Sequence, residues 1–281
     1  MKYIFISIVL LFSIIAFSSN SYGQDEFPVL EGPYLGQKPP GLIPEVFGPD
    51  VITTKDWETG AVFTPGMKEF YFVKGNTNLV SQYKNNRWSE PALSHKGYRS
   101  FISPDGKIMH SGNKYRKRTG VGWSEIKSLG SPFKDIPIMR LSVSSKDTYY
   151  FDTRTKDGSG TIRYSRLIDG KREKPRVLGK EINTGAWIAH PFIAPDESYL
   201  IWDAQKEGGY GNGDFYISFR QKDGSWGAAI NMGDKINTEL EEFFVSVTPD
   251  GKYLFFERVI SPDNVDIYWV DAQIIETLRP K

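Results

Sequence analysis

One short phrase returns five times along this chain, and it constrains the fold more than any other feature. The phrase is an apolar strand, a tight turn and a second strand rich in aromatic residues. Its copies are FTPGMKEFYF from Phe63, FISPDGKIMH from Phe101, LSVSSKDTYYF from Leu141, FIAPDESYLIW from Phe192 and SVTPDGKYLFF from Ser246. Pro presets φ for the second position of a turn, and Gly tolerates positive φ near its end, so the phrase predicts a β-hairpin.

The copies recur at a regular spacing. Their turn anchors lie 39, 41, 50 and 54 residues apart, at Pro65, Pro104, Ser145, Pro195 and Pro249. The flanks recur in step, because Ile-Asn-Thr occurs at residues 182–184 and 236–238, and an Asp-apolar-Tyr segment at 214–216 and 266–268. A period of about 40–50 residues made of strands and turns is typical of propeller blades. We therefore predict an all-β fold, a single β-propeller.

Five four-stranded blades account for the copies. Six are possible if the N-terminal segment is a degenerate blade. A β-sandwich also has short, evenly spaced strands. It gives no reason, however, for the turn phrase to return together with its flanks.

The first 23 residues have the layout of a secretory signal peptide. Lys2 supplies a positive charge, residues 3–17 are almost wholly apolar, and Ser21 and Gly23 are small residues before a cleavage point at Gln24. A membrane anchor is the alternative, but the apolar run is shorter than the ~20 residues that a spanning helix needs. We expect residues 1–23 to be removed and the mature chain to be exported, to a periplasm or outside the cell, without a membrane span.

Residues 24–56 form a Pro-rich lead-in, and residues 57–281 the propeller domain. Six prolines exclude a continuous helix from the lead-in. Residues 43–47 resemble the fourth strand of a unit, and a ring of blades must hide its terminal edge strands. We predict that this N-terminal segment completes or flanks the last blade and closes the ring. Residues 272–278 form either a short helix or an outer strand.

Charge and cysteine content exclude several classes of function. The chain has 35 Lys and Arg against 34 Asp and Glu, and a non-specific grip on nucleic acid needs a basic excess. The sequence contains no cysteine, so disulfides, thiolate metal sites and cysteine nucleophiles are excluded. Its three histidines form no paired metal motif. We expect a monomer with no cofactor, no metal and no nucleic-acid partner.

The inner strand of each blade lines the channel of a propeller, so the residues just before each turn are candidates for ligand contact. Three basic residues lie five positions before their anchors, and two acidic residues lie seven before. They are Arg99, Arg140 and His190, with Glu58 and Glu242. Together they predict a ring of mixed charge for an anionic or polyhydroxylated ligand, because arginine suits carboxylates. In the alternative, these charges pair with one another.

Acidic residues near the ends of second strands, and one Gly-rich loop, are further candidates for a functional site. Asp203 and Glu257 follow the second strands of blades four and five, and Asp152 lies near the matching place in blade three. Two carboxylates facing each other can cleave a glycosidic bond, so Asp203 and Glu257 are the catalytic candidates. The Gly-rich run 208–213 precedes a strand rather than a helix, which predicts a hairpin tip where Tyr210 can contact a ligand.

The repeated phrase resembles the TolB-like, WD-repeat-like β-propeller family of bacterial exported proteins. Residues 103–107 match its Ser-Pro-Asp-Gly-Lys turn in full, residues 248–252 differ at one place, and the resemblance covers roughly residues 57–271. It implies a scaffold that binds proteins or small ligands, with no shared catalytic residues to carry over.

These observations predict an exported, non-catalytic propeller scaffold that binds a protein, peptide or sugar at the mouth of its channel. A carbohydrate-active enzyme, either a glycoside hydrolase or a polysaccharide lyase, is the alternative. A structural envelope protein without a selective ligand is a third possibility.

Overall fold

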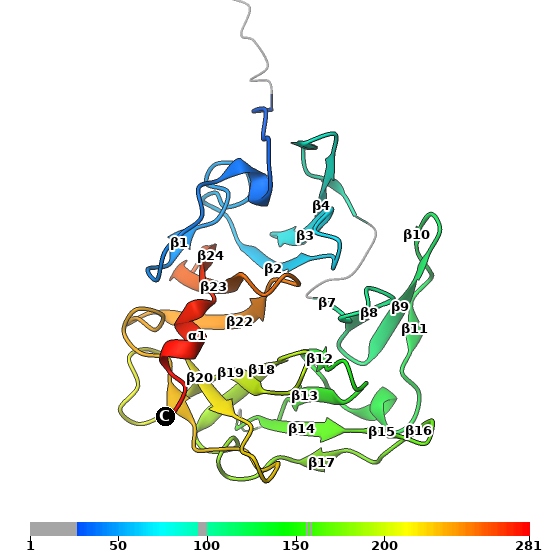
Figure 1. The fold of residues 1–281 in the computed structure, drawn as a ribbon, viewed down its shortest axis with the longest axis vertical. Helices are drawn as coiled ribbons and strands as arrows, with labels where there is room; N and C mark the ends of the chain where they lie inside the picture. Colours follow the sequence, from blue (N-terminus) through cyan, green and yellow to red (C-terminus); the bar gives the residue numbers. More distant parts are fainter. Residues whose placement is uncertain (1–26, 95–99, 156, 158) are drawn as a thin grey trace, which may run out of the picture.

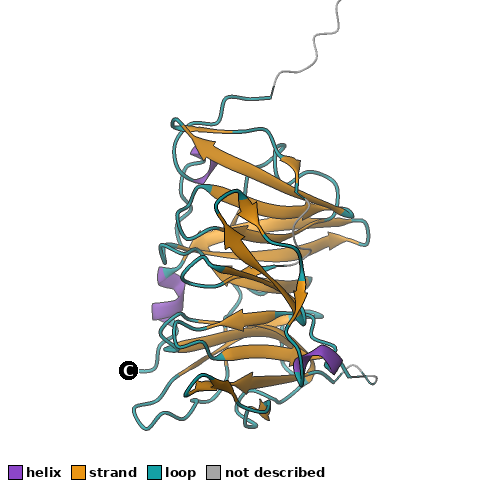
Figure 2. Ribbon diagram, turned by 90° about the vertical axis from the view of Figure 1, so that its right-hand side faces the viewer, coloured by secondary structure: helices purple, strands orange, loops and turns teal. Residues whose placement is uncertain are grey.

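A computed structural model describes residues 27–94, 100–155, 157 and 159–281 of the chain. The expected leader, residues 1–23, lies outside this part. The described chain is almost entirely strand and loop, with only short helices (Figure 2). Five antiparallel sheets are arranged around a centre, as Figure 1 shows. The prediction of a five-bladed β-propeller is confirmed.

Each blade is a meander of short antiparallel strands. The first two blades each gain an extra short strand, β6 and β11, beside their third strand. Blade 1 consists of β2 (Glu58–Phe63), β3 (Glu69–Lys74), β4 (Thr77–Lys84), β5 (Arg87–Trp88) and β6 (Ala92–Leu93). Blade 2 consists of β7 (Phe101–Ile102), β8 (Ile108–Ser111), β9 (Lys114–Thr119), β10 (Gly122–Trp123) and β11 (Lys127–Ser128).

The remaining blades have four strands each, and a small hairpin, β15 (Leu167–Ile168) with β16 (Lys171–Arg172), extends from blade 3. Blade 3 consists of β12 (Leu141–Val143), β13 (Tyr149–Thr153), β14 (Thr161–Ser165) and β17 (Arg176–Val177). Blade 4 consists of β18 (Ala186–Ile193), β19 (Tyr199–Gln205), β20 (Asp214–Phe219) and β21 (Ile230–Asn231). Blade 5 consists of β22 (Glu241–Val247), β23 (Tyr253–Ser261), β24 (Asn264–Asp271) and β1 (Glu45–Val46).

The inner strands form a complete circle. β2 contacts β7, β7 contacts β12, β12 contacts β18, β18 contacts β22, and β22 contacts β2 again. Apolar side chains of neighbouring blades fill the space between the sheets, so the core is divided into clusters between blades. A blade cannot bury both of its faces by itself, and the ring is therefore the smallest stable unit.

All five copies of the turn phrase form the same turn. In each, the N–H of the fourth residue donates to the carbonyl of the first, at Met67, Gly106, Asp147, Glu197 and Gly251, over 2.8 to 3.1 Å. The fourth residue also has positive φ in every copy, between 52° and 74°. Only two copies use glycine there, so the worn copies Asp147 and Glu197 take the left-handed conformation at some cost.

The N-terminal segment closes the ring, as predicted. β1 pairs antiparallel with β24, with Glu45 opposite Trp269 and Val46 opposite Tyr268. Phe47 is fully buried, and its ring lies 4.8 Å from that of Phe255 and 5.2 Å from those of Phe70 and Trp269. The lead-in thus pairs with the last blade through β1 and packs Phe47 between the first and last blades.

Three short helices lie outside the sheets: η1 (Tyr34–Gly36), η2 (Phe133–Asp135) and α1 (Gln273–Thr277). Of the two structures left open for residues 272–278, the helix is the one formed. Among the described residues, no helix is long and apolar enough to cross a membrane.

Candidate ligand-binding site

The inner strands of blades 1, 4 and 5 are each bent by a β-bulge. The pairing register shifts at the same place in β2, β18 and β22. There, φ is 70° at Gly60, 49° at His190 and 53° at Phe244. These residues occupy the position five before the turn anchor. Bulges re-aim side chains and are frequent beside functional sites, so the bulge sets the directions of the His190 and Phe244 side chains.

Two of these bulges are held by buried carboxylates of the preceding blade, which accept hydrogen bonds from their backbone amides. Asp152 at the end of β13 is fully buried, and its Oδ2 accepts the N–H of His190 in blade 4 at 2.9 Å. Its Oδ1 accepts the N–H groups of Met139 at 2.8 Å and Arg140 at 3.0 Å. Glu257 of β23 likewise accepts the N–H of Gly60 in blade 1. Asp152 and Glu257 therefore connect consecutive blades.

Glu58 and Glu242 make the same contacts at the starts of their blades, and both are fully buried. Glu58 Oε1 accepts the Thr54 hydroxyl at 2.6 Å, and Lys74 Nζ lies 3.7 Å from it. Glu242 Oε1 accepts the Thr238 hydroxyl at 2.6 Å and Arg258 Nε at 2.7 Å. Because each acid binds a threonine of the lead-in and a base of its own sheet, both belong to the framework. These contacts favour the alternative in which the charges pair with one another, and a ligand-binding role of Glu58 and Glu242 stays a prediction.

His190 and Asp203 form a polar pair beside the channel. His190 Nδ1 lies 3.0 Å from Asp203 Oδ1 and 3.1 Å from Oδ2. The imidazole lies against Phe244, with ring centroids 3.9 Å apart. Both side chains are mostly buried, at 12% and 8% exposure. Nε2 of His190 is buried and has no hydrogen-bond partner among the described residues. The carboxylate orients the ring, and Nε2 is the ring nitrogen left without a partner among the described residues.

This pair lines a cavity of about 650 Å³, which we call the Trp187 cavity. It lies where the inner strands begin and where the second strands end, so its walls come from several blades. Its lining includes Trp57, Arg154, Trp187, His190, Asp203, Gln205, Asn212, Glu241, Phe243 and Phe244. Trp187 is 58% exposed and has a φ of 52°, so a large aromatic face is held in a strained backbone position at the cavity wall.

Glu241 adds a second acid to this cavity. Burial raises the pKa of Glu241, and the negative charge of Asp203 raises it further, while His190 acts in the opposite direction. Asp203 and Glu241 thus interact through their charges inside one cavity. Sequence reasoning missed both Glu241 and Trp187. The adjacent acids Glu241 and Glu242 were the available signal, because in an extended strand consecutive side chains point to opposite sides.

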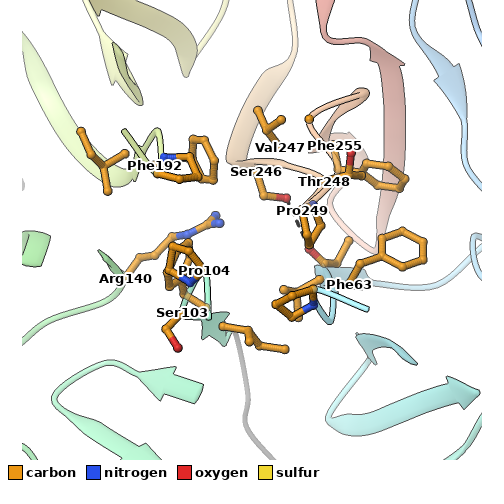
Figure 3. A pocket seen from close by; sticks show the side chains of 18 of the residues that line it. Phe63, Ser103, Pro104, Arg140, Phe192, Ser246, Val247, Thr248, Pro249 and Phe255 are labelled. Carbon is orange, nitrogen blue, oxygen red and sulfur yellow. Dashed lines mark hydrogen bonds between the residues drawn. The ribbon is translucent and has the colours of Figure 1, made fainter. Parts of the chain in front are cut away.

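Arg140 lines a different cavity, of about 370 Å³, which we call the Arg140 cavity. It lies at the opposite ends of the inner strands, among the hairpin turns. Figure 3 shows the guanidinium pointing into the space beside Phe192, Ser246 and Pro104. Arg140 is 6% exposed, and its guanidinium carbon lies 5.3 Å from the centre of the Phe244 ring. Burial lowers the pKa of Arg140 to about 10, and the nearby carboxylates, chiefly Glu257, oppose this effect.

The predicted ring of charge is therefore divided. Arg140 and His190 come from equivalent positions, yet they line separate cavities. Arg99 lies outside the described residues. Tyr210 is 49% exposed on the loop before Asn212 and Gly213, and these two residues do line the Trp187 cavity. Asp203 faces that cavity, whereas Glu257 lines a small separate void with Arg140.

Metal coordination has no evident place in this part of the chain. Within the described ranges, no three His, Asp or Glu side chains are grouped so that they can hold a metal ion.

Comparison with known proteins yields matches in structure alone. No family model matches the sequence, and no curated protein matches it. The catalytic domain of a GH62 α-L-arabinofuranosidase from Coprinopsis cinerea superposes with a TM-score of 0.55 at 10% identity, over 83% of this chain and 98% of that one.

TolB-like propellers are also among the structural neighbours. A putative TolB from Agrobacterium tumefaciens superposes with a TM-score of 0.48 at 14% identity, over 78% of each chain. TolB from Acinetobacter baumannii gives 0.47 at 15%, over 78% of this chain and 55% of that one. At such low identity these likenesses concern the fold alone.

Proposed function

We propose that the chain is a ligand-binding propeller and that the Trp187 cavity takes an oligosaccharide. Its volume of about 650 Å³ lies in the range of small-molecule sites. The observation that carries the proposal is the exposed Trp187 beside the buried His190–Asp203 pair. A flat aromatic face packs against the apolar face of a sugar ring, and a fixed polar pair selects the orientation of its hydroxyl groups.

A ligand screen tests this proposal. Purified chain is screened against neutral pentose and hexose oligosaccharides and against oligogalacturonates, with the melting temperature as readout, because a ligand stabilises the state it binds. For the best ligand, Trp187→Ala is expected to weaken binding by about tenfold, a typical loss for an aromatic contact residue. His190→Ala is expected to weaken it as well.

The matched control is Val177→Ala on β17 of blade 3, an apolar side chain that is 51% exposed and outside the cavity lining. It is expected to bind as the parent chain does. If no oligosaccharide raises the melting temperature, or if Trp187→Ala binds the best ligand unchanged, the proposal is wrong.

Glycoside cleavage is the second candidate function, and one observation favours it. Asp203 and Glu241 share the cavity, and the pKa of Glu241 is raised by burial and by Asp203. An acid of raised pKa that shares a site with a second carboxylate is an arrangement that glycosidases use for general acid and partner. On this view Glu241 protonates the leaving oxygen and Asp203 is the second carboxylate. Release of nitrophenol from aryl glycosides that is abolished in both Glu241→Gln and Asp203→Asn would support it.

We also propose that the chain is exported and that residues 1–23 are removed. The supporting observation is the charged start, apolar run and small-residue cleavage site of the sequence. N-terminal sequencing of the protein from the periplasmic or culture fraction is expected to begin at Gln24. A product that retains Met1 would contradict this.

A further inference from the structure

The side of the ring that carries the hairpin turns contains a buried cation, Arg140, which does not line the Trp187 cavity. Arg140 is buried at the base of the Arg140 cavity. Within the described part of the chain, no carboxylate oxygen lies within 4.0 Å of its guanidinium, and its Nε has no hydrogen-bond partner. Removing a guanidinium from water costs several kcal/mol unless ion pairs and hydrogen bonds offset it. Nearby carboxylates and the Phe244 ring offset part of this cost, but no hydrogen bond from Nε to the described residues contributes.

The neighbouring acids do not supply the missing contacts. Glu257, Asp203 and Asp152 favour the charged form of Arg140 through their negative charge. Their printed contacts, however, are with other groups: Glu257 Oε1 accepts the Gly60 amide, Asp152 accepts three amides, and Asp203 pairs with His190. They keep Arg140 protonated at neutral pH while leaving its guanidinium directed into the cavity (Figure 3).

The rest of the lining is mostly apolar, with hydroxyl groups at Ser103, Tyr199, Ser246 and Thr248. Its walls come from the aromatic residues of the hairpins and from the turn prolines, including Phe63, Phe101, Phe192, Phe255, Pro104 and Pro249. Two lining hydroxyls are already engaged, because Ser103 donates to Asp105 and Thr248 to Asp250, each at 2.7 Å. Among the described lining residues, Arg140 is therefore the one cation, and it faces a largely apolar space of about 370 Å³. Such a space matches a monoanion better than a phosphate dianion, which needs more donors.

We propose that the Arg140 cavity is a second binding site, independent of the Trp187 cavity, for a small monocarboxylate with an apolar body. The carboxylate pairs with the guanidinium of Arg140, in the two-pronged geometry that the guanidinium favours. The apolar body packs between the phenylalanine rings and the turn prolines. Aliphatic and aromatic acids share this chemistry, and the experiment distinguishes them.

Isothermal titration calorimetry of the whole purified chain tests the proposal with octanoate as the aliphatic probe and N-acetylphenylalanine as the aromatic probe. 1-Octanol and N-acetylphenylalanine amide are the uncharged counterparts, and acetate is the carboxylate without a body. At least one of the two acids is expected to bind saturably and at least tenfold more tightly than its uncharged counterpart and than acetate. Which of the two acids binds shows whether the cavity prefers an aliphatic or an aromatic group beside the carboxylate.

Arg140→Met keeps the length of the side chain and removes its charge, and is expected to weaken binding at least tenfold. Ser246→Phe keeps Arg140 and fills the cavity, so it is also expected to weaken binding of the acid. It therefore tests the proposal a second time if Arg140→Met does not fold. Circular dichroism reports folding of each variant. Trp187→Ala at the other cavity is expected to bind the acid as the parent chain does.

Several results would overturn the proposal. One is that neither acid binds more tightly than acetate. Another is that the uncharged counterpart binds equally well. Unchanged binding in folded Arg140→Met or in Ser246→Phe would also overturn it, as would loss of binding in Trp187→Ala.

Discussion

Asp152 illustrates how a single residue connects two blades. Its carboxylate accepts amides from Met139 and Arg140 in blade 3 and from His190 in blade 4, and the side chain has no exposed surface. Burial raises the pKa of Asp152, while these hydrogen bonds act in the opposite direction. The burial of Asp152 is thus compensated by three hydrogen bonds, because these backbone amides need an acceptor.

Asp152→Ala is expected to lower the free energy of unfolding by about 2–4 kcal/mol, because buried amide donors lose their acceptor. The measurement is urea unfolding followed by tryptophan fluorescence. Asp223→Ala, at an exposed loop acid that caps only Ser225, is the control and should change stability by less than about 0.5 kcal/mol. A change below about 1 kcal/mol in Asp152→Ala would contradict the bridging role.

His110 makes stability depend on pH. Burial, with a smaller contribution from Arg172, lowers its pKa from 6.5 to about 3. The folded state therefore binds this proton less readily than the unfolded state. Its stabilising effect is complete above pH 6.5 and is lost as the pH falls from 6.5 toward 3.

His110→Leu removes this titration. Between pH 6.5 and 4.5 the parent chain is expected to lose about 2 kcal/mol more unfolding free energy than the variant, since a full proton difference changes stability by about 1.4 kcal/mol per pH unit. Urea unfolding at several pH values gives both curves. Parallel curves for the two proteins would rule out the buried neutral His110.

At the scale of elements, the sequence predicts the hairpins well. The turn phrase combines a turn residue with two apolar flanks, so even the copies that have lost Pro or Gly, at Ser145 and Glu197, keep their register and form the expected turn. The bulges are not predictable in the same way. His190 and Phe244 carry positive φ, which is uncommon for residues other than glycine, because tertiary contacts impose the bend.

Those bulges explain why the sequence predicted only some of the residues that line the Trp187 cavity. The alignment on turns identified Arg140 and His190 as equivalent channel residues, but bulges re-aim side chains independently in each blade. The two residues consequently line opposite cavities. Trp187 and Glu241 carried no repeated pattern, so only the folded arrangement brings them beside Asp203. The carboxylates Asp152, Asp203 and Glu257 do occupy matching places, although only Asp203 lines the Trp187 cavity.

Phe47 is the fully buried aromatic side chain of the closing segment. Phe47→Ala is expected to lower the free energy of unfolding by about 3–5 kcal/mol, because it leaves a cavity among Phe70, Phe255 and Trp269. Ile43→Ala, four residues earlier and 61% exposed, is the control and should be nearly neutral. Equal stabilities of the two variants, measured by urea unfolding, would show that this segment does not pack as described.

At the scale of the whole molecule, ring closure is the condition for both cavities. Each is lined by inner strands of several blades, so an open ring would have neither. Closure joins β1, near the start of the described chain, to β24, near its end. The chain contains no natural cysteine, and an engineered pair therefore reports on this junction without competing thiols.

The most direct measurement is disulfide formation between Val46→Cys and Tyr268→Cys, which lie opposite each other in β1 and β24. Directly opposed strand residues are within disulfide reach. We expect near-complete cross-linking on mild oxidation, counted by thiol titration and mass spectrometry, and a higher melting temperature when oxidised. The pair Ile43→Cys and Tyr268→Cys, three residues out of register, should stay reduced. A Val46–Tyr268 pair that remains reduced in the folded protein would contradict the closed ring.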